Sequence, residues 1–472
     1  MMLLTRLSGT AALTLCLGAT AGMAETLLVT NFDPAGDGSL QAALDAAAAS
    51  PERTTILVTE TGGTLTTETG LSYTGSSALT IFGNGLTVAS QANVTLFSAI
   101  GTEELHLDGI SFQGPGGFSI TERGDLDGAA AKGIFLDVAD DAAGDIDLIL
   151  SNVSVAEVAG HGIHVSDCTL ADECGGGGGG AGEGSPASIN VQLTNVRIQG
   201  VGNGSFDADG LRVDERGDGD ITFTGQNVLV QGVGADGIEL DEGQDGDVSI
   251  ELIGGVFIGN GAYCDPELLA GYMPAEPEGE FDEGEMAADA IPGLVVESPD
   301  DRCFERQVDF YDDGSVEEYE FAIDVDDGFD VDEAGTGSLF GTFSGGEMSG
   351  NFDEGYDFDE EGPGDIDVVF TGLIATGNTD DAIKLSEADD GHVYAVFTAV
   401  EATGNGGVGI VGEEEDSGNL QLVLVGVATA GNDDGDLGVE GVQEDDGEGL
   451  VYVIDSEIAD GIETEGATLT AN

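Results

Sequence analysis

Residues 237–260 read GIELDEGQDGDVSIELIGGVFIGN, and this stretch contains the pattern that decides the fold. Apolar residues alternate with polar ones in three short runs separated by Gly, Asp and Asn, as they do in half-buried strands. The runs are Ile238 and Leu240, then Val248, Ile250 and Leu252, then Val256 and Ile258. Since the apolar residues follow no helical period, the stretch predicts three short strands joined by polar turns.

The stretch is one unit of a repeat. Glycines recur at a step of 27 residues, at Gly219 and Gly246 and then at Gly337, Gly364, Gly391 and Gly418. Asparagines that each follow a glycine keep the same step, at Asn351, Asn378, Asn405 and Asn432. Asn260 precedes Asn351 by 91 residues, as Gly246 precedes Gly337, so both columns contain one insertion of 64 residues. Two agreeing registers indicate an array with one supersecondary unit per 27 residues.

Three strands per repeat predict the coil of a parallel β-helix. Each strand would pair with its counterpart one coil further on, about 4.8 Å away. The asparagine column would then form a ladder of stacked amides within one turn. A β-roll is the rival solenoid, but its tandem GGxGxDxUx pattern is absent from the sequence. A sandwich or barrel would not need a 27-residue register, so we predict an all-β solenoid.

The N-terminal segment carries a resemblance to a known superfamily. Residues 26–44, TLLVTNFDPAGDGSLQAAL, resemble the start of secreted right-handed parallel β-helix proteins of the pectate-lyase-like superfamily: a strand, a glycine-rich turn and a short capping helix. Ser39 suits the N-cap of a helix over residues 40–49, which would cover the open end of the solenoid. The superfamily holds lyases, hydrolases, epimerases, adhesins and structural proteins, so the resemblance selects no activity.

The organisation of the chain follows from its composition. Residues 1–24 are predicted to be a secretory signal, since Arg6 precedes an apolar run and small residues precede Glu25. We expect the cap and first coils in residues 25–125, and acidic repeats in residues 126–472 with insertions at about 166–187 and 262–326. No later run reaches 18 uninterrupted apolar residues, so no transmembrane segment is expected. We therefore predict a secreted protein, periplasmic or extracellular.

The charge of the chain excludes some partners. The chain has 93 acidic and 10 basic residues, a net charge of −83, which becomes −84 when Arg6 leaves with the signal. Such a surface repels nucleic acid and anionic membranes and calls for cations. Salt-adapted secreted proteins have this balance, and an acidic disordered tail is excluded because 40% of the residues are hydrophobic.

Four cysteines remain after the signal is removed, an even number that suits an oxidising compartment. They fall where the repeat is interrupted: Cys168 and Cys174 at a glycine-rich excursion, and Cys264 and Cys303 across the 64-residue insertion. We predict the disulfides Cys168–Cys174 and Cys264–Cys303, which keep each bridge within its own loop. A metal site is less expected here, because no His or Cys cluster of ligand spacing accompanies them.

Acidic pairs follow the first strand of successive repeats, and we expect them in one turn of each coil. Their positions are Asp214-Glu215, Asp241-Glu242, Asp332-Glu333, Asp359-Glu360 and Ser386-Glu387. Carboxylates stacked about 4.8 Å apart repel one another and suit Ca²⁺, which takes six to eight oxygen ligands in flexible geometry. The sequence thus predicts a calcium ladder at these residues. The alternative is a set of hydrated, screened turn acids with no fixed ion.

Catalytic candidates are few. The middle residue of each first strand is expected to point outward, giving a strip of His164, Arg212, Glu239, Asp330, Asp357 and Lys384. In lyases of the resembled superfamily such an outer face carries the site, so Arg212 beside Glu239, or Lys384 beside Asp357, are the residues that a lyase would use. The alternative for both pairs is a cross-strand ion pair that relieves acidic crowding.

A hydrolase is less expected. The strings Asn378-Thr379-Asp380-Asp381 and Gly160-His161-Gly162 resemble those of polygalacturonase-like hydrolases, but they stand in reversed order and more than 200 residues apart. The chain also has no tryptophan and only 6% aromatic residues, whereas carbohydrate clefts usually offer aromatic faces.

The sequence favours a structural or adhesive extracellular protein that binds cations, with a polysaccharide or a cell-surface molecule as partner. The alternative is a polysaccharide lyase or glycoside hydrolase acting on an extracellular, uronate-type glycan. The sequence does not determine the oligomeric state or the substrate.

Overall fold

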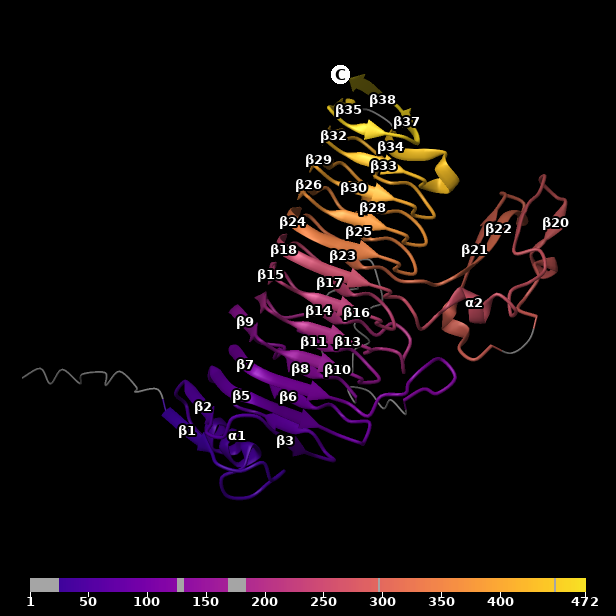
Figure 1. Ribbon diagram of the computed structural model, residues 1–472. Helices are drawn as coiled ribbons and strands as arrows, with labels where there is room; N and C mark the ends of the chain where they lie inside the picture. Colours follow the sequence, from indigo (N-terminus) through magenta and orange to yellow (C-terminus); the bar gives the residue numbers. More distant parts are fainter. Residues whose placement is uncertain (1–24, 125–130, 169–183, 296–297, 445–446) are drawn as a thin grey trace, which may run out of the picture.

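The computed structural model describes residues 25–124, 131–168, 184–295, 298–444 and 447–472 (Figure 1). In this part of the chain, no helix has both the length and the apolar character needed to cross a membrane. The predicted signal, residues 1–24, lies outside the described residues.

One long sheet has twelve strands, each contributed by a successive coil, and all of its strand pairs are parallel. In chain order the strands are β4 (Leu71–Tyr73), β6 (Phe97–Ile100), β8 (Ile134–Asp137), β11 (Ile163–Ser166), β14 (Leu211–Glu215), β17 (Ile238–Glu242), β23 (Phe329–Glu333), β25 (Tyr356–Glu360), β28 (Ile383–Glu387), β31 (Val411–Glu414), β34 (Leu437–Gln443) and β37 (Gly461–Glu465).

A second sheet of 22 strands supplies the other faces of the coils. One parallel stack runs through β1 (Glu25–Val29), β2 (Thr54–Val58), β5 (Leu79–Ala89), β7 (Glu104–Gln113), β9 (Gly144–Ser151), β12 (Ala187–Thr194), β15 (Ile221–Gln226), β18 (Val248–Ile258), β24 (Leu339–Ser349), β26 (Asp365–Thr371), β29 (His392–Thr398), β32 (Asn419–Val425), β35 (Gly449–Ile454) and β38 (Ala467–Ala471).

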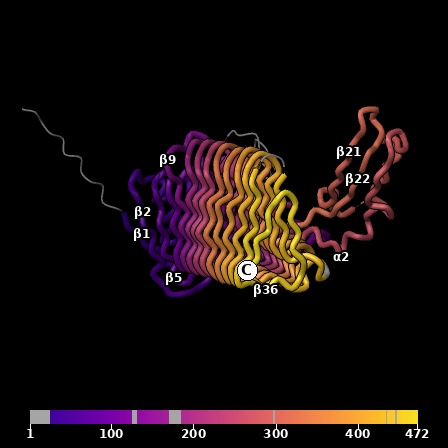
Figure 2. The backbone as a smooth tube through the Cα atoms, turned by 90° about the horizontal axis from the view of Figure 1, so that it is seen from above, coloured from indigo at the N-terminus to yellow at the C-terminus, as the bar shows by residue number. Residues whose placement is uncertain are grey.

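Shorter strands form a further parallel stack, in which they pair with one another or with the far halves of the long strands β5, β7, β18 and β24. They are β3 (Gly63–Thr66), β10 (Ser154–Ala156), β13 (Arg197–Gln199), β16 (Leu229–Gln231), β27 (Ile374–Thr376), β30 (Glu401–Thr403), β33 (Ala428–Ala430) and β36 (Glu457–Ile458). The stack of parallel coils is plain in the view from above (Figure 2). The predicted all-β, parallel β-helix fold is therefore confirmed. Its coils are right-handed, as crossovers between parallel strands of one sheet nearly always are.

The interior of the solenoid is a continuous apolar core, because every second residue of a strand points inward. Aromatic rings stack there from coil to coil, with ring centroids 4.7 Å apart for Phe343 and Phe370 and 5.3 Å for Phe370 and Phe397. The predicted asparagine ladder is also confirmed. The side-chain amide of each of its first four residues donates to Oδ1 of the next, at 2.8–3.1 Å, along Asn260, Asn351, Asn378, Asn405 and Asn432.

The glycine column has a steric cause. A Cβ atom on Gly364 would lie 1.6 Å from the carbonyl oxygen of Gly337, one coil below, and a Cβ on Gly391 would lie 1.7 Å from that of Gly364. The backbones of successive coils approach too closely at this turn for any side chain. The 27-residue spacing of the glycines therefore reflects direct contact between coils.

Two elements depart from the coil pattern. Helix α1 (Leu40–Ala48) packs on β1 and β4 through Leu40 and Leu44, and the Ser39 hydroxyl accepts a hydrogen bond from the amide of Ala42. The long insertion projects sideways from the coils in both views (Figures 1 and 2). It contains α2 (Pro266–Leu269), β19 (Glu278–Glu280), β20 (Met286–Ala287), β21 (Phe304–Phe310), β22 (Ser315–Ile323) and the short 3-10 helices 288–290 and 301–303. A further 3-10 helix spans Asp433–Gly435 near the C-terminal end.

The disulfide prediction is confirmed where the structure describes both cysteines. Cys264 and Cys303 are bonded across the base of the insertion, and both are buried beside Tyr263 and Leu269. Cys174, the predicted partner of Cys168, lies outside the described residues.

Candidate functional site

The register of the twelve-stranded sheet places the predicted outer strip on adjacent strands. His164 of β11 lies opposite Arg212 of β14, Arg212 lies opposite Glu239 of β17, and Asp357 of β25 lies opposite Lys384 of β28. Asp330 of β23 lies between Glu239 and Asp357. The two predicted lyase pairs are therefore separated by a strand and do not form one site.

Arg212 is the centre of a buried ionic cluster. Its guanidinium contacts five carboxylates, and its relative exposure is only 5%. The distances from its nitrogens are 2.5 Å to Glu239, 2.7 Å to Asp214, 3.1 Å to Asp207 and to Asp241, and 3.6 Å to Asp209. Arg216 also binds Asp241. The carboxylates hold the pKa of Arg212 well above its ordinary value although burial alone would lower it, so this residue is a fixed cation.

A lysine and a histidine meet beside this cluster. Lys132, two residues before β8, places its Nζ against Nδ1 of His164 and lies 4.4 Å from the centre of the Phe135 ring. Nε2 of His164 is 2.6 Å from Oδ2 of Asp214. Both Lys132 and His164 are 5% exposed. The contacts therefore form a chain from Lys132 through His164 and Asp214 to Arg212.

The protonation of this chain follows from burial. Burial, opposed by Asp214 and reinforced by Arg212, lowers the pKa of Lys132 to about 8. Burial, with the charge of Lys132, lowers the pKa of His164 to about 3, so its imidazole is neutral. A neutral His164 that donates from Nε2 to Asp214 presents Nδ1 as an acceptor to Lys132. Burial would raise the pKa of Asp214, but Arg212 and His164 hold it well below its usual value.

A second histidine lies against the first. The rings of His161 and His164 have centroids 4.6 Å apart, and Nδ1 of His161 accepts a hydrogen bond from the amide of Asp209 at 3.0 Å. Burial lowers the pKa of His161 to about 3, and Lys132 and Arg212 act in the same direction. The string Gly160-His161-Gly162 therefore contributes to this cluster, although the sequence interpretation had set it aside.

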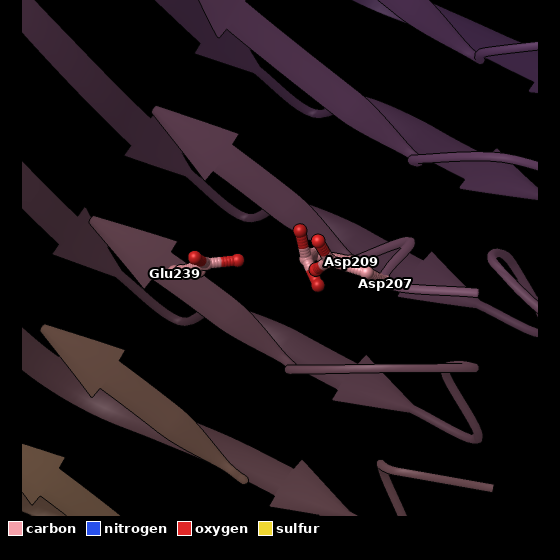
Figure 3. Close-up of side chains that lie close together, drawn as sticks. All are labelled: Asp207, Asp209 and Glu239. Atoms are coloured by element: carbon pink, nitrogen blue, oxygen red, sulfur yellow. The ribbon is translucent and has the colours of Figure 1, made fainter. Parts of the chain in front are cut away.

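Among the described residues, three groups of three carboxylates could hold a metal ion. The first is Asp207, Asp209 and Glu239, which converge from a turn and a strand (Figure 3). The second is Glu239, Asp241 and Asp332. Arg212 contacts every member of the first group and two of the second, so a cation already lies among these acids. The third group, Asp327, Asp353 and Glu354, has no such guanidinium among its contacts in the described residues.

The location predicted for the acidic pairs is wrong. The pairs lie in the strands β14, β17, β23 and β25 and not in a turn, so the Asp and the Glu of each pair point to opposite faces. Asp214, Asp241, Asp332 and Asp359 point to the outer face, where Asp214 and Asp241 are buried in the ion pairs of Arg212. Glu215, Glu242, Glu333, Glu360 and Glu387 point into the solenoid and are 0% exposed. Of these nine predicted calcium ligands, Asp241 and Asp332 alone belong to a group of described residues that could hold a metal.

Lys384 lies in a different environment from Lys132. Its Nζ is 2.9 Å from Asp357 and 3.9 Å from Asp359. Burial would lower its pKa, but these carboxylates outweigh burial and raise it. Lys384 is thus held as a cation in a cross-strand ion pair, which was the alternative interpretation of this pair.

The sequence interpretation missed Lys132 and gave no role to His161. Lys132 precedes the strand of Phe135, which pairs with that of His164, but those strands are separated by insertions and do not keep the 27-residue step. The sequence feature that could have indicated these residues is the small number of basic side chains: the chain has only two lysines, Lys132 and Lys384, and four histidines.

The other sheet carries an open groove. A cavity of about 640 Å³ lies over β15, β18, β24 and β26 and is lined by hydroxyls, acids and the exposed ring of Phe340. Its lining contains no basic side chain, so it is distinct from the cluster around Arg212.

Comparisons with known proteins concern the fold. No protein-family model and no curated protein matches the sequence. The structure is similar to that of the pectate lyase Pel9A, with a TM-score of 0.35 and 12% identity over 94% of this chain and 79% of that chain. It is also similar to a mutant of the periplasmic alginate epimerase AlgG, with a TM-score of 0.37 and 9% identity over 88% of this chain and 77% of that chain. The third similar structure is the A-module of the Azotobacter vinelandii mannuronan C-5 epimerase AlgE4, with a TM-score of 0.37 and 12% identity over 93% of this chain and 97% of that chain. At these scores and identities the similarities assign no activity to this chain.

Proposed function

We propose that the protein is an extracytoplasmic enzyme that removes a proton from a uronate residue of an extracellular polysaccharide, most simply as a lyase. The observation that carries this proposal is the contact between Lys132 and a neutral His164, which Asp214 orients and Arg212 adjoins. An ion-pair network that only relieves acidic crowding has no need for a lysine placed on an imidazole. In a proton-transfer site, by contrast, such a contact holds the lysine in place and helps to keep it neutral.

Proton abstraction next to a carboxylate needs a base whose pKa lies near the working pH. Lys132, with a pKa of about 8, meets this condition, whereas His164 and Lys384 do not. The proposed step moves the proton from the carbon beside the uronate carboxyl to neutral Nζ of Lys132. The electron pair of the resulting carbanion forms a C=C bond and expels the glycosidic oxygen on the next carbon, which takes a proton from water. The products are an unsaturated sugar end and a chain with a free hydroxyl group. Protonation of the same carbanion from the other face would instead give the epimer.

The charge of the chain bears on the substrate. A polyuronate would meet a net charge of about −84, so a divalent cation is expected to accompany it. The group Asp327, Asp353 and Glu354 fits Ca²⁺, since its three ligand oxygens lie within 4.8 Å of one another and Ca²⁺ prefers carboxylate oxygens. Burial and the charge of Glu354 raise the pKa of Asp353 to about 10, and burial and the charge of Asp357 raise that of Glu354 to about 7. A bound cation would relieve this repulsion between carboxylates.

The direct test is incubation of the purified protein with alginate, pectate and sulfated polysaccharides. Appearance of unsaturated ends would support a lyase, and a change in uronate configuration without chain cleavage would support epimerisation. New reducing ends without unsaturation would point to the hydrolase alternative. No change in any polymer, with and without Ca²⁺, would contradict an enzymatic role.

We expect the reaction rate to rise with pH through a midpoint near 8. Lys132 is a base only when it is neutral, and its neutral fraction grows as the pH passes its pKa. The measurement is kcat/KM against pH. Asp214→Asn should move the midpoint to lower pH, because the charge of Asp214 raises the pKa of Lys132. A rate that falls over this range would contradict the role of Lys132 as base.

We expect millimolar Ca²⁺ to raise the melting temperature by more than NaCl of equal ionic strength does. A ligand that binds only the folded state stabilises it by mass action, whereas NaCl acts only by screening. A chelator should reverse the gain. Asp353→Asn should remove most of the Ca²⁺-specific part, while the exposed control Asp390→Asn should retain it. Equal responses to Ca²⁺ and NaCl would show that the acids bind no specific ion.

A structural or adhesive role is the second candidate, and one observation favours it. Lys132, His164 and Arg212 are each only 5% exposed, as expected of a network that serves stability. Under this role, substitution of Lys132 would alter the melting temperature and no polymer would be changed.

The proposed location and architecture have separate support. A buried disulfide such as Cys264–Cys303 is typical of proteins outside the cytoplasm. We further propose that the coil is 27 residues long outside the insertions, that α1 caps the first coil, and that the insertion 262–326 is an appended lobe. Pairs such as Asp357 with Lys384 and the contacts of α1 with β1 and β4 support these assignments.

A further inference from the structure

Six glutamates form a column inside the solenoid. Each lies opposite the next on neighbouring strands of the twelve-stranded sheet, and each is 0% exposed: Glu215, Glu242, Glu333, Glu360, Glu387 and Glu414. Gln443 continues the register after Glu414. The column therefore extends through all the acidic coils. Because Gln443 occupies the same position in the next coil, a side-chain amide also fits there.

The carboxyl groups of Glu215, Glu242, Glu360 and Glu387 accept hydrogen bonds from amides of the turn that follows each strand. Oε1 of Glu360 accepts hydrogen bonds from the amides of Gly362 at 3.0 Å and Gly364 at 3.2 Å. Oε1 of Glu387 accepts from Asp389 at 3.1 Å and Gly391 at 2.9 Å. These bonds explain why the strands end in a Glu that points inward, since the tight turn offers amides that need an acceptor.

The second oxygen of the Glu360 and Glu387 carboxyl groups lies near other carboxyl groups of the column. Oε2 of Glu360 and Oε2 of Glu387 are buried and have no donor among the described residues. Their side chains lie within hydrogen-bonding range of each other, and Glu360 lies within range of Glu333. Two carboxylates are both acceptors and cannot bond, whereas a carboxylic acid donates to its neighbour. Buried, unpartnered anions at this spacing would also carry a large desolvation cost.

The charged groups that face the column do not neutralise it. Asp167 lies beside Glu215, Asp247 beside Glu333, and Asp416 and His392 beside Glu414. Only His392 has a cationic form. The ion pairs of Lys and Arg in the described residues are all made with acids outside the column.

We propose that this glutamate column is a proton-binding site, in which neighbouring carboxyl groups share protons at neutral pH and hold the coils together by carboxyl-to-carboxyl hydrogen bonds. The geometry assigns protons and not Ca²⁺ to these residues, since none of them belongs to a group of described residues that could hold a metal. The asparagine ladder performs the same task at another turn with permanent amide donors.

The column makes the stability of the fold depend on pH. Burial, with the neighbouring carboxyl groups, raises the pKa of Glu360 and of Glu387 to about 9, far above the usual value near 4.5. Between these two values the folded chain holds a proton that the unfolded chain releases. The stabilisation is therefore complete below pH 4.5 and declines as the pH rises towards 9. Each such proton changes the unfolding equilibrium constant about tenfold per pH unit within that window.

The test is the substitution Glu387→Gln, which supplies a permanent amide donor as Gln443 does. We expect this variant to melt at the same temperature as the wild type near pH 5 and at a higher temperature at pH 8–9. The slope of log K for unfolding against pH should fall by about one, because the variant releases one proton fewer on unfolding. The matched control is Glu415→Gln, which makes the same side-chain exchange at an exposed neighbour of Glu414 and should leave the slope unchanged.

A second measurement does not depend on a variant that folds. The infrared spectrum of the wild-type protein at pH 7 should contain the band of un-ionised carboxylic acid, and Glu387→Gln should weaken that band. Absence of the band at pH 7 would overturn the proposal. So would a Ca²⁺-specific rise in melting temperature that Glu387→Gln abolishes and Asp353→Asn does not, because the column would then bind cations.

Discussion

Lys132→Ala is expected to lower the turnover of a uronate polymer by about 10²–10⁴-fold, the usual contribution of a general base. The physical reason is that Lys132 is the only described basic side chain of this cluster whose pKa, about 8, allows it to accept a proton under ordinary conditions. Arg212 is a fixed cation, and His164 is neutral with a pKa of about 3. The measurement is the initial rate of unsaturated product at pH 8.

Two further variants separate chemistry from charge. Lys132→Arg keeps the positive charge but cannot act as a base, because a guanidinium does not lose its proton. It should therefore be nearly as inactive as Lys132→Ala. Arg197→Ala removes one exposed cation from the other sheet and should leave the rate within about twofold. Full activity of Lys132→Arg would show that Lys132 contributes only its charge.

Gly364→Ala is expected to destabilise the fold by about 3 kcal/mol or more, the upper range for overpacking. The added Cβ would lie 1.6 Å from the carbonyl oxygen of Gly337 and 2.9 Å from Oε1 of Glu360. The first contact is with backbone, which a rotamer change cannot relieve, so the coils must separate locally. The measurement is the midpoint of denaturant unfolding, supported by amide hydrogen exchange in the neighbouring coils, since repeat proteins can unfold in parts.

The control for this substitution is Gly271→Ala in the insertion. A Cβ there meets no atom within 4 Å, and the backbone is not in the left-handed region. Its effect should stay within about 0.5 kcal/mol. If both variants unfolded at the same midpoint, close approach of the coils would not explain the glycine column.

The sequence alone determined the features that repeat. In a solenoid the neighbours in space are a constant number of residues apart, so contact between coils appears in the sequence as a fixed step. Gly337 and Gly364 touch, and Asn351 and Asn378 are hydrogen bonded, for this reason. The disulfide Cys264–Cys303 was also predictable, because both cysteines lie within one insertion.

Which face of the sheet each residue of an acidic pair points to could be determined only from the structure. An Asp-Glu pair has the same letters whether a strand ends before it or includes it, and one residue of register exchanges the two faces. The strands include the pair because the following turn offers amides to an inward carboxyl group, as Gly362 and Gly364 do for Glu360. A ladder expected at the surface is therefore a buried column.

The candidate site required the structure for a different reason. Lys132, His164 and Arg212 lie on or beside successive coils, but the residues that pair there are 29 and 48 positions apart, Ile134 with Ile163 and Ile163 with Leu211. Insertions between these strands remove the constant step, so no period in the sequence aligns the three side chains. Only the closed stack of coils brings them together, and burial within it changes the pKa of Lys132 and of His164.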